Sequence, residues 1–350
     1  NGGTSYSILG SAIGNPDLAW EKQQKTTIGL SGRLFDNTSF SIEYYSRITR
    51  GMLLASYINS MSGASANFTD NAGDFENRGF DLTINSTVYQ NREHNVSIRP
   101  YLNLNYNDQR VRALADGKDQ LVGVNSGNYA YQTGSPVYWA LPIFKGINPD
   151  NGHPEWYLPN TDRMDTRTDD NAVTDKYGNN GTALIQNTGK RKAAPLNGGF
   201  GLNVTYEGFT LDMGFAFTYG KYMLNLDRRA MENPGSFGIN NLSRKALDYW
   251  TPENRNSRQP LIDRANYPRF VEQDTRILED ASFIRMKNLS LSYRFSKETI
   301  DKIKFFNGIR IYGSARNLWT ITKYTEYPNS IAGGGTPPTR EYTFGVEVKF

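Results

Sequence analysis

The chain ends on Glu341-Tyr342-Thr343-Phe344-Gly345-Val346-Glu347-Val348-Lys349-Phe350, a stretch that alternates without a fault. Its apolar side chains occupy every second position: Tyr342, Phe344, Val346, Val348 and Phe350. Because successive side chains of a β-strand point to opposite faces, the stretch predicts a strand with one apolar and one polar face. A terminal strand of a soluble sheet tends to fray, whereas a strand of a transmembrane β-barrel has lipid on one face and a wet lumen on the other. The pattern therefore favours a barrel strand.

The same period of two recurs in earlier parts of the chain. The segments are 26–35, 38–46, 79–89, 95–106, 200–206, 209–219, 289–295 and 309–312. With the terminal stretch they predict about nine strands, many of them near ten residues long. Ten residues, at about 3.3 Å each and tilted by about 40°, span roughly the 25 Å apolar band of an outer membrane.

The connections between these segments alternate between short and long. Short turns are expected at 36–37, 90–93, 207–208 and 297–307, the last with a helical turn, and long structureless links at 50–75, 107–195, 221–280 and 322–340. Outer-membrane barrels have short periplasmic turns and long extracellular loops. Counting back from Phe350 at the periplasmic end places every short turn in the periplasm and every long link outside. We also expect a helix within 241–250, capped by Asn241.

Composition narrows the function classes. The chain has no cysteine, which excludes disulfides, thiolate metal sites and cysteine nucleophiles. Its net charge of +4 is too balanced to indicate nucleic-acid binding. A high content of Tyr (22) and Phe (18) agrees with interfacial aromatic girdles, although a Tyr-rich soluble all-β protein would show it too. We find no catalytic motif among its two histidines, its serines or its Gly-rich stretches, and predict no enzyme activity, cofactor or metal.

Two sets of residues are candidates for contact with a solute. The longest link carries aromatic side chains on which sugar rings or peptides pack, namely Tyr131, Trp139, Trp156 and Tyr157. The alternative is that these side chains only fold the loop onto the barrel mouth. The lumen-facing set is Arg99, Tyr101, Asn103, Arg294 and Arg310. It either lines a substrate path or forms a hydrated wall of mixed charge against a plug. An acidic stretch at 162–175 leaves a calcium site as an alternative to a solvated loop.

Several strings along the chain resemble TonB-dependent barrels of the SusC/RagA type. They are Asn15-Pro16-Asp17-Leu18-Ala19-Trp20-Glu21-Lys22, Asn71-Ala72-Gly73-Asp74-Phe75-Glu76-Asn77-Arg78-Gly79-Phe80, Leu247-Asp248-Tyr249-Trp250-Thr251-Pro252-Glu253-Asn254, Ala281-Ser282-Phe283-Ile284-Arg285-Met286-Lys287-Asn288-Leu289-Ser290-Leu291-Ser292-Tyr293 and Ser314-Ala315-Arg316-Asn317-Leu318-Trp319. Each is weak alone, but together they run in the family's order from Asn15 to Phe350. Within this resemblance the terminal residues Tyr342, Val346, Val348 and Phe350 look like the barrel-assembly signal.

The resemblance implies that residues 1–350 are the C-terminal part of an all-β, antiparallel transmembrane barrel of about 22 strands. It implies that a plug domain, a TonB box and the earlier strands lie outside this chain. It also implies the outer membrane of a Gram-negative, Bacteroidetes-like bacterium, with membrane lipid around the barrel. The implied partners are a SusD-like surface lipoprotein and, through the missing N-terminal part, the TonB complex.

Three functions remain open at this point. The first is TonB-dependent import of oligosaccharides or oligopeptides, captured between the barrel and a SusD-like lid. The second is a structural or docking role for the barrel in a larger envelope complex. The third is a soluble all-β enzyme or carbohydrate-binding protein, which would need a paired acid–base cluster, and none with suitable spacing is found.

Overall fold

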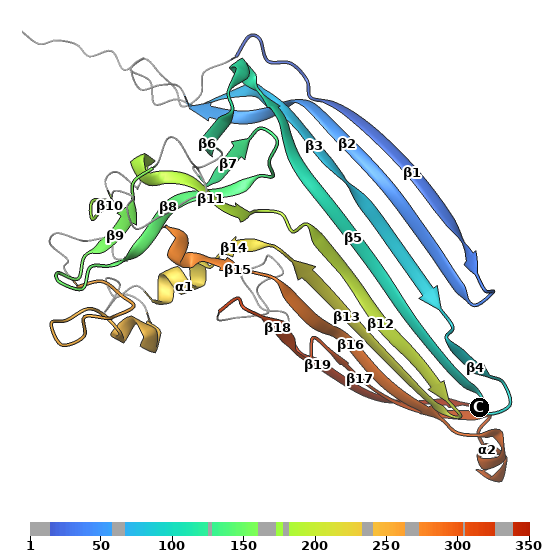
Figure 1. Ribbon diagram of the computed structural model, residues 1–350. Coiled ribbons are helices and arrows are strands. Elements are labelled where there is room, and N and C mark those ends of the chain that lie inside the picture. The colour runs from blue at the N-terminus through green and yellow to red at the C-terminus, as the bar shows by residue number, and fades with distance from the viewer. Residues whose placement is uncertain are drawn as a thin grey trace, which may run out of the picture.

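The structure is a computed structural model that describes residues 15–57, 67–124, 128–159, 173–177, 182–232, 241–262, 273–303, 305–325 and 339–350. Its main body is one large sheet in which strands follow one another in chain order (Figure 1). The order is β1 (Lys22–Leu34), β2 (Thr38–Tyr57), β3 (Asn67–Ser86), β5 (Val96–Leu114), β12 (Leu196–Tyr206), β13 (Phe209–Tyr219), β16 (Phe283–Arg294), β17 (Gly308–Arg316) and β19 (Glu341–Lys349). Every neighbouring pair is antiparallel. The nine predicted strands are therefore confirmed.

The register of the sheet brings the apolar positions of all these strands onto one face. Tyr44 lies opposite Phe80, which in turn lies opposite Tyr106 on the next strand. Phe200 lies opposite both Leu102 and Phe215. Since directly opposed residues of an antiparallel pair point to the same side of a sheet, the alternation read in single segments becomes one continuous apolar surface. Much of it is exposed, with Leu291 in the interior of the sheet at 51%.

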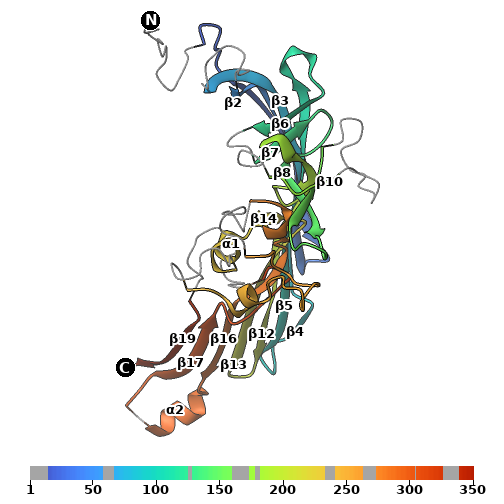
Figure 2. The ribbon, with the colours of Figure 1, turned by 90° about the vertical axis from the view of Figure 1, so that its left-hand side faces the viewer.

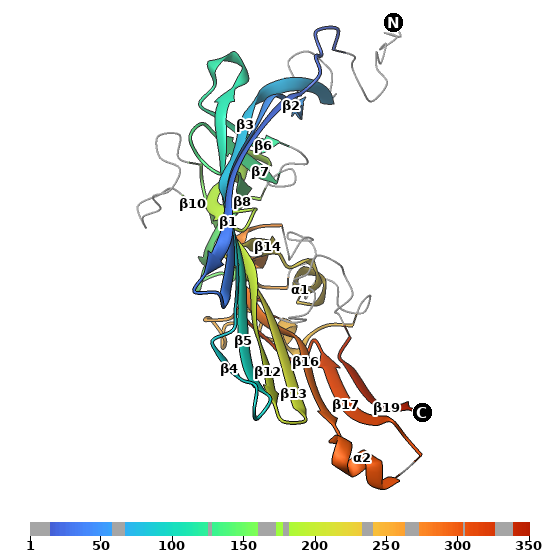
Figure 3. The ribbon, with the colours of Figure 1, turned by 90° about the vertical axis from the view of Figure 1, so that its right-hand side faces the viewer.

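Rings on this apolar face pack across the strands. The Phe80 and Tyr106 rings stack at 5.5 Å, and the Phe200 and Phe215 rings at 4.9 Å. Seen from its two sides, the sheet is a thin curved wall (Figures 2 and 3). Among the described residues, β1 and β19 each pair on one side only, so the wall is open at both edges.

The short connections lie together at one end of the wall, together with the C-terminus (Figure 1). The turns use the left-handed region that tight turns demand, with φ of +51° at Phe35 and at Glu207 and +55° at Asp36. β4 (Tyr89–Asn91) pairs with the start of β5 near this end. α2 (Lys297–Ile303) occupies the longest of the short connections and confirms the helical turn expected there.

The expectation of structureless long links is wrong in two places. β2 and β3 continue for 20 residues each, well into the segment 50–75. Their outer parts lack apolar alternation and are held by polar contacts: Asn71 Nδ2 donates to the Gly51 carbonyl at 2.7 Å, beside a shift in register. Periodicity of apolar residues reports burial in lipid or core, so it does not detect these outer parts, where the buried residues Leu54, Ala72 and Phe75 follow no regular alternation.

The link 107–195 contains a second, six-stranded sheet. Its strands are β6 (Gln120–Val124), β7 (Tyr129–Gln132), β8 (Tyr138–Ile147), β9 (Pro154–Tyr157), β10 (Val173–Thr174) and β11 (Ile185–Arg191). A buried apolar cluster joins this loop sheet to the outer ends of β2, β3 and β5. Its members are Leu54, Ala72, Phe75, Val111, Leu114, Tyr131 and Val137. The largest loop is therefore a folded unit packed on the wall.

The remaining elements belong to the other long connections. β14 (Tyr222–Leu224) pairs with β15 (Leu278–Asp280), and β18 (Thr320–Thr322) pairs with β16. Short 3-10 helices lie at Ala115–Gly117, Thr182–Leu184, Arg244–Leu247 and Thr275–Ile277.

The helix expected within 241–250 is wrong in extent and in cap. The structure has only the 3-10 helix Arg244–Leu247, and Ser243 caps it instead of Asn241. α1 (Leu226–Met231) was missed; Asn225 Oδ1 accepts a hydrogen bond from the Arg228 amide at 2.9 Å at its start. Both helices are too short for an apolar period to develop, so tertiary contacts and not propensity set their limits.

Candidate functional site: the polar face of the wall and the loops at its mouth

The polar face of the wall carries every side chain that the sequence assigned to the lumen. Arg99, Tyr101 and Asn103 alternate along β5, and Asn103 Oδ1 accepts a hydrogen bond from Thr83 Oγ1 at 3.2 Å. Arg294 of β16 lies opposite Arg310 of β17. The two like charges are balanced in part by β19, since Arg310 Nη1 lies 3.6 Å from Glu347 Oε2. The face is polar and charged, but the assignment of these residues to a substrate path remains a prediction.

Tyrosines on this face lie across glycines of the neighbouring strands. A Cβ built on Gly201 would stand 2.4 Å from the Tyr101 hydroxyl, and one on Gly345 would stand 2.4 Å from the Tyr312 hydroxyl. A side chain at Gly345 would push the Tyr312 ring away from the wall, and one at Gly201 would meet both the Tyr101 ring and the Met213 carbonyl oxygen. The glycines thus let the phenol rings lie flat, which keeps the space in front of the polar face free.

A ladder of hydrogen bonds crosses β2, β3 and β5, and the sequence did not single it out. Tyr45 Oη donates to Asn107 Oδ1 at 3.0 Å and accepts from Asn105 Nδ2 at 3.2 Å. Asn105 Nδ2 also donates to Asp81 Oδ1 at 2.7 Å. Together with Lys25, Glu43 and Arg47 these residues line a polar cavity of about 420 Å³. The available signal was the alternation of asparagines at 103, 105 and 107 along one strand.

A second polar cavity lies nearer the short turns. It measures about 550 Å³ and is lined by Arg33, Arg99, Tyr101, Asn203 and Asp212, among others. Asp212 accepts a hydrogen bond from Asn288 Nδ2. Two of the predicted lumen residues, Arg99 and Tyr101, therefore line one hollow together with the carboxylate of Asp212, which suits hydrogen bonding to a polar solute or to another polar protein surface.

The loop aromatics lie within the loop sheet and are mostly turned inward. Trp156 is 1% exposed, and its indole N–H donates to Asp274 Oδ2 at 2.8 Å. Tyr131 is 6% exposed and packs edge-on against Phe75 at 6.5 Å between ring centres. Both rings contribute to the core that holds the loop in place. In this arrangement neither ring face is available to a sugar.

The other two loop aromatics keep part of their surface. Trp139 is half-buried; its indole N–H donates to the Tyr222 carbonyl at 2.9 Å, and its ring packs on Tyr129 at 5.3 Å. Tyr157 is also half-buried, and its carbonyl accepts a hydrogen bond from Gln186. Trp139 therefore ties the loop sheet to β14. A substrate contact by any of the four aromatics remains a prediction.

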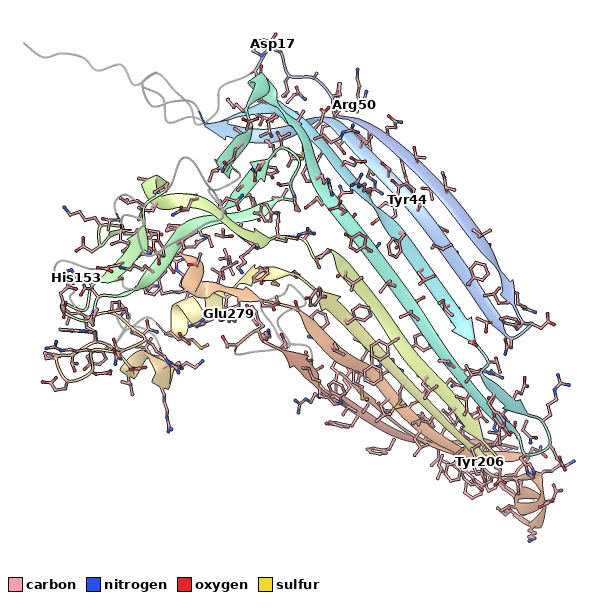
Figure 4. The ribbon with its side chains drawn as sticks, viewed as in Figure 1. Asp17, Tyr44, Arg50, His153, Tyr206 and Glu279 are labelled. Atoms are coloured by element: carbon pink, nitrogen blue, oxygen red, sulfur yellow. The ribbon has the colours of Figure 1, made fainter. Side chains whose placement is uncertain are left out.

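A buried ionic network joins the loops beyond β13 and β16. Arg228 of α1 donates to Glu232 Oε2 at 2.9 Å and to Glu279 Oε1 at 2.8 Å. Glu279, which lies beside α1 (Figure 4), also accepts from the Thr325 amide at 2.8 Å and from the Thr325 hydroxyl at 2.6 Å. The network therefore links segments 225–232, 278–280 and 324–325, although they lie far apart in the sequence.

The network shifts the pKa values of Glu279 and Arg228. Burial by itself would raise the pKa of Glu279, but the hydrogen bonds from Thr325, Arg228 and Asn225 outweigh burial and lower it below its ordinary value. Burial likewise opposes the charge on Arg228, yet its contacts with Glu279 and Glu232 raise its pKa. Both groups are held in their charged forms, so the network stays an ion-pair network at neutral pH.

The residues likened to an assembly signal lie on the last strand and at its end. Tyr342, Val346 and Val348 share the apolar face, and Val346 lies opposite Ile311. Phe350 packs against Phe305 at 5.8 Å and against Phe306 at 5.3 Å between ring centres. An aromatic cluster thus closes the turn end of the wall beside α2, and Tyr206 lies at the same end (Figure 4). The signalling role of these residues remains a prediction.

The acidic stretch 162–175 lies largely outside the described residues. Asp175, which is described, has its Oδ2 3.1 Å from His153 Nδ1. In the part of the chain that the structure describes, no group of three or more metal-ligating side chains lies together. None of the helices in that part is long and apolar enough to pass through a bilayer.

Comparison with known proteins shows similarity along nearly the whole chain. No family model matches it. The chain is 26% identical to TonB-dependent receptor P3 of Formosa agariphila over 96% of its length and 24% identical to TonB-dependent receptor SusC of Bacteroides thetaiotaomicron over all of it. It spans about a third of each of these relatives, 35% and 34% of their lengths.

Solved structures show the same similarity. The RagAB peptide transporter matches with a TM-score of 0.77 and 31% identity, over 97% of this chain and 36% of that one. The "open-open" state of the RagAB peptide importer matches with a TM-score of 0.76 at 31% identity, over the same shares. These proteins are named as receptors and transporters, not as enzymes. The open wall described above fits one part of such a barrel.

Proposed function

We propose that this chain, a part of a SusC/RagA-type TonB-dependent receptor, forms the C-terminal wall and much of the outer mouth of a nutrient importer in the outer membrane. The observation that carries the proposal is the register of the main sheet. It aligns apolar residues on one face and mostly polar, charged or small residues on the other across all nine strands. A wall of this kind separates lipid from a wet pore.

The width of the pore makes gating necessary. A solute too large for a porin needs a wide pore to pass the membrane. A barrel of about 22 strands encloses a lumen of that width, and such a lumen is closed by a plug. In our proposal the plug and the segment that contacts the TonB complex lie in parts of the receptor outside this chain. The polar cavities at Tyr45 and at Arg99 would then face either the plug or the passing solute.

The loops would receive a SusD-like surface lipoprotein. The segments 107–195 and 221–280 supply the folded loop sheet and the ionic network, and both lie at the end of the wall opposite the short turns (Figure 1). Because the loop sheet is anchored by a buried apolar cluster, its outer surface is a stable platform on which a lid could close. Substrate would be captured between the lid and the mouth.

The substrate would be an oligopeptide or an oligosaccharide. A peptide substrate has the more direct support, because RagAB, whose structures match at 30–31% identity, is a peptide transporter. Support for an oligosaccharide substrate comes from the resemblance to the family and from the loop aromatics Trp139 and Tyr157, whose side chains remain partly exposed to solvent.

The test is purification of the full-length receptor from its native membrane. Co-purification with a surface lipoprotein, together with peptide or glycan density between the two proteins, is the expected result. A matched strain with loop segment 107–195 exchanged for a short turn should lose the lipoprotein. A receptor that binds other envelope proteins through these loops, and never a solute, would favour a docking role and overturn import.

A further inference from the structure

A row of three aromatic side chains crosses the apolar face on β2, β3 and β5. Tyr44 lies opposite Phe80, and Phe80 lies opposite Tyr106. All three are at least 36% exposed. In transmembrane barrels, aromatic residues form girdles where the hydrocarbon meets the lipid headgroups. Arg50, farther along β2, lies nearer the loops than Tyr44 does (Figure 4). In the proposed barrel the aromatic row therefore marks the outer membrane interface.

The apolar face ends directly beyond this row, in the direction of the loops. On β5 the residues of this face are apolar from Ile98 to Tyr106, and the next two are Asp108 and Arg110. β3 changes in the same way, from Phe80 to Arg78. At about 3.3 Å per residue and a tilt of about 40°, the apolar stretch of β5 covers roughly 20 Å of the lipid band. The charged residues therefore begin at the level of the headgroups.

These charged residues form one cluster, here named the outer arginine cluster: Arg78, Arg110 and Arg112 with Asp108 and Glu76. Asp108 Oδ2 accepts hydrogen bonds from Arg110 Nε at 2.7 Å and from Arg78 Nη2 at 3.4 Å. Arg112 Nε lies 4.0 Å from Glu76 Oε2. The side chains of Asp108 and Glu76 are only 12% and 16% exposed, whereas those of the three arginines are 40–48% exposed. A group that approaches from the lipid therefore meets guanidinium groups first.

Most of the hydrogen-bonding capacity of these arginines is free for such a group. A guanidinium has five N–H donors. Arg110 uses its Nε and Arg78 its Nη2 on Asp108, while Arg112 forms an ion pair too long for a hydrogen bond. The two contacts to Asp108 also orient the guanidinium groups in advance. Because a guanidinium binds phosphate in a forked, bidentate way, the cluster has the donors that a phosphate group needs.

Two further cations extend the charged region towards the edge strand β1. Lys22 lies opposite Arg50 on the same face, and both are exposed. The carboxylates nearest to them, Asp74 and Glu21, accept hydrogen bonds from backbone amides at 3.0 Å and 2.6 Å. The region thus has five cations and four carboxylates, and each of these carboxylates has a partner within the wall. Basic residues at a membrane surface attract anionic lipid headgroups.

We propose that the outer arginine cluster binds the phosphate group of a phosphorylated lipid in the outer leaflet of the membrane. The acyl chains would lie along the apolar face, past Phe80 and Tyr106, and the arginines would hold the phosphate. The source is a lipid and not free phosphate, because the cluster continues the apolar face and lies on the opposite side of the wall from the lumen. The proposal rests on the proposed position of the wall in the membrane, but not on import.

The experiment is native mass spectrometry of the full-length receptor, purified and delipidated in detergent, after addition of diphosphoryl lipid A. Saturable retention of this lipid is expected, with far weaker retention of the same lipid after removal of its phosphates. Equal retention of the two lipids would overturn the proposal. Displacement of the lipid by inorganic phosphate would also overturn it, and would assign the cluster to free phosphate.

A double variant, Arg110→Gln with Arg112→Gln, removes two of the exposed guanidinium groups. We expect it to weaken retention of lipid A by roughly tenfold or more, because charge-assisted hydrogen bonds are lost. The matched control is Arg316→Gln, which removes an exposed arginine from the polar face, where it lies 3.6 Å from Glu341. This control should stay within about twofold of the unchanged receptor.

Heat-modifiable migration shows whether each variant is a folded barrel. If the double variant does not fold, Arg112→Gln alone is the test, because its ion pair at 4.0 Å contributes least to the wall; it should weaken retention severalfold. Unchanged retention in a folded variant would overturn the proposal. A receptor that docks proteins and imports nothing would still retain the lipid, whereas a chain that forms no heat-modifiable barrel would refute the proposed membrane wall itself.

Discussion

Tyr312 of β17 lies across Gly345 of β19, so close that a Cβ at Gly345 would meet the phenol ring at 2.4 Å. The two residues lie opposite each other on the polar face. No backbone atom is among the three nearest neighbours of that added Cβ. The Tyr312 side chain is therefore what requires a glycine at position 345. A double mutant of the two residues tests this dependence.

We expect Gly345→Ala to destabilise the barrel, because the new methyl group displaces the Tyr312 ring. In a Tyr312→Ala background the same change should be nearly neutral. The coupling energy between the two sites should be about 1 kcal/mol or more, within the range found for residues in contact. Urea unfolding of the full-length barrel in detergent measures it. Additive effects would show that the ring does not depend on the glycine.

Phe215 and Thr218 test the assignment of the two faces. Phe215 lies on the apolar face, where it stacks on Phe200 at 4.9 Å, and Thr218 lies on the polar face, where its hydroxyl donates to Asn197 Oδ1 at 3.1 Å. Phe215→Arg should cost about 2–4 kcal/mol if it lies near the bilayer midplane, whereas Thr218→Arg should cost much less. Unfolding from lipid vesicles measures both. A similar loss in the two variants would argue against a lipid-facing apolar surface.

Deletion of Phe350 should reduce outer-membrane assembly of the full-length receptor without changing its synthesis. Because Phe350 also packs on Phe306, Phe306→Ala is the matched control for lost packing. We expect the deletion to lower the amount of heat-modifiable barrel in outer-membrane fractions, and the control to lower it far less. Equal defects would indicate that the aromatic cluster, and not a terminal signal, is what assembly requires.

Acid should loosen the loops through Glu279. Its pKa is lowered by hydrogen bonds from Thr325, Arg228 and Asn225, which outweigh burial. A carboxyl group with a lowered pKa in the folded state stabilises fully above its ordinary pKa, and this contribution is lost as the pH falls through the lowered value. We therefore expect protease cleavage of the loops to rise below about pH 4. Glu279→Gln should be cleaved faster at neutral pH and respond less to acid; an unchanged acid response in this variant would assign the effect to another group.

Trp156 should matter for the loop fold more than for direct contact with a solute. Trp156→Phe keeps a ring but removes the indole N–H that donates to buried Asp274. We expect the loop sheet to lose about 1–3 kcal/mol, because a buried acceptor loses a partner. Hydrogen exchange of β8 and β9 measures the change, with Tyr157→Phe as a control that should show little. A loss of substrate binding with unchanged exchange would instead place Trp156 in the substrate site.

The strands of the main wall were predictable because the alternation of apolar and polar residues lies within each strand's own sequence. In 209–219 the alternation matches β13 residue for residue, and the short turns follow from it. A barrel strand needs apolar residues towards lipid and polar residues towards water, and this requirement fixes every second residue whatever the rest of the protein does. For the same reason the predicted lumen residues fell on the polar face.

The loops were not predictable in this way. The loop sheet, the helix α1 and the network of Arg228 and Glu279 join segments separated by dozens of residues, and no local period marks them. Trp156 shows the difference most clearly: its sequence left open whether the ring contacts a solute or only folds the loop, and its partner Asp274 lies 118 residues away.

The sequence by itself determined which residues lie on the apolar face of the wall and which on the polar face, since that choice depends on each strand alone. Only the tertiary structure decided which polar atoms meet, such as Trp156 Nε1 with Asp274 and Arg228 with Glu279. Hydrogen bonds are directional and short, and their partners are set by how the loops pack on one another.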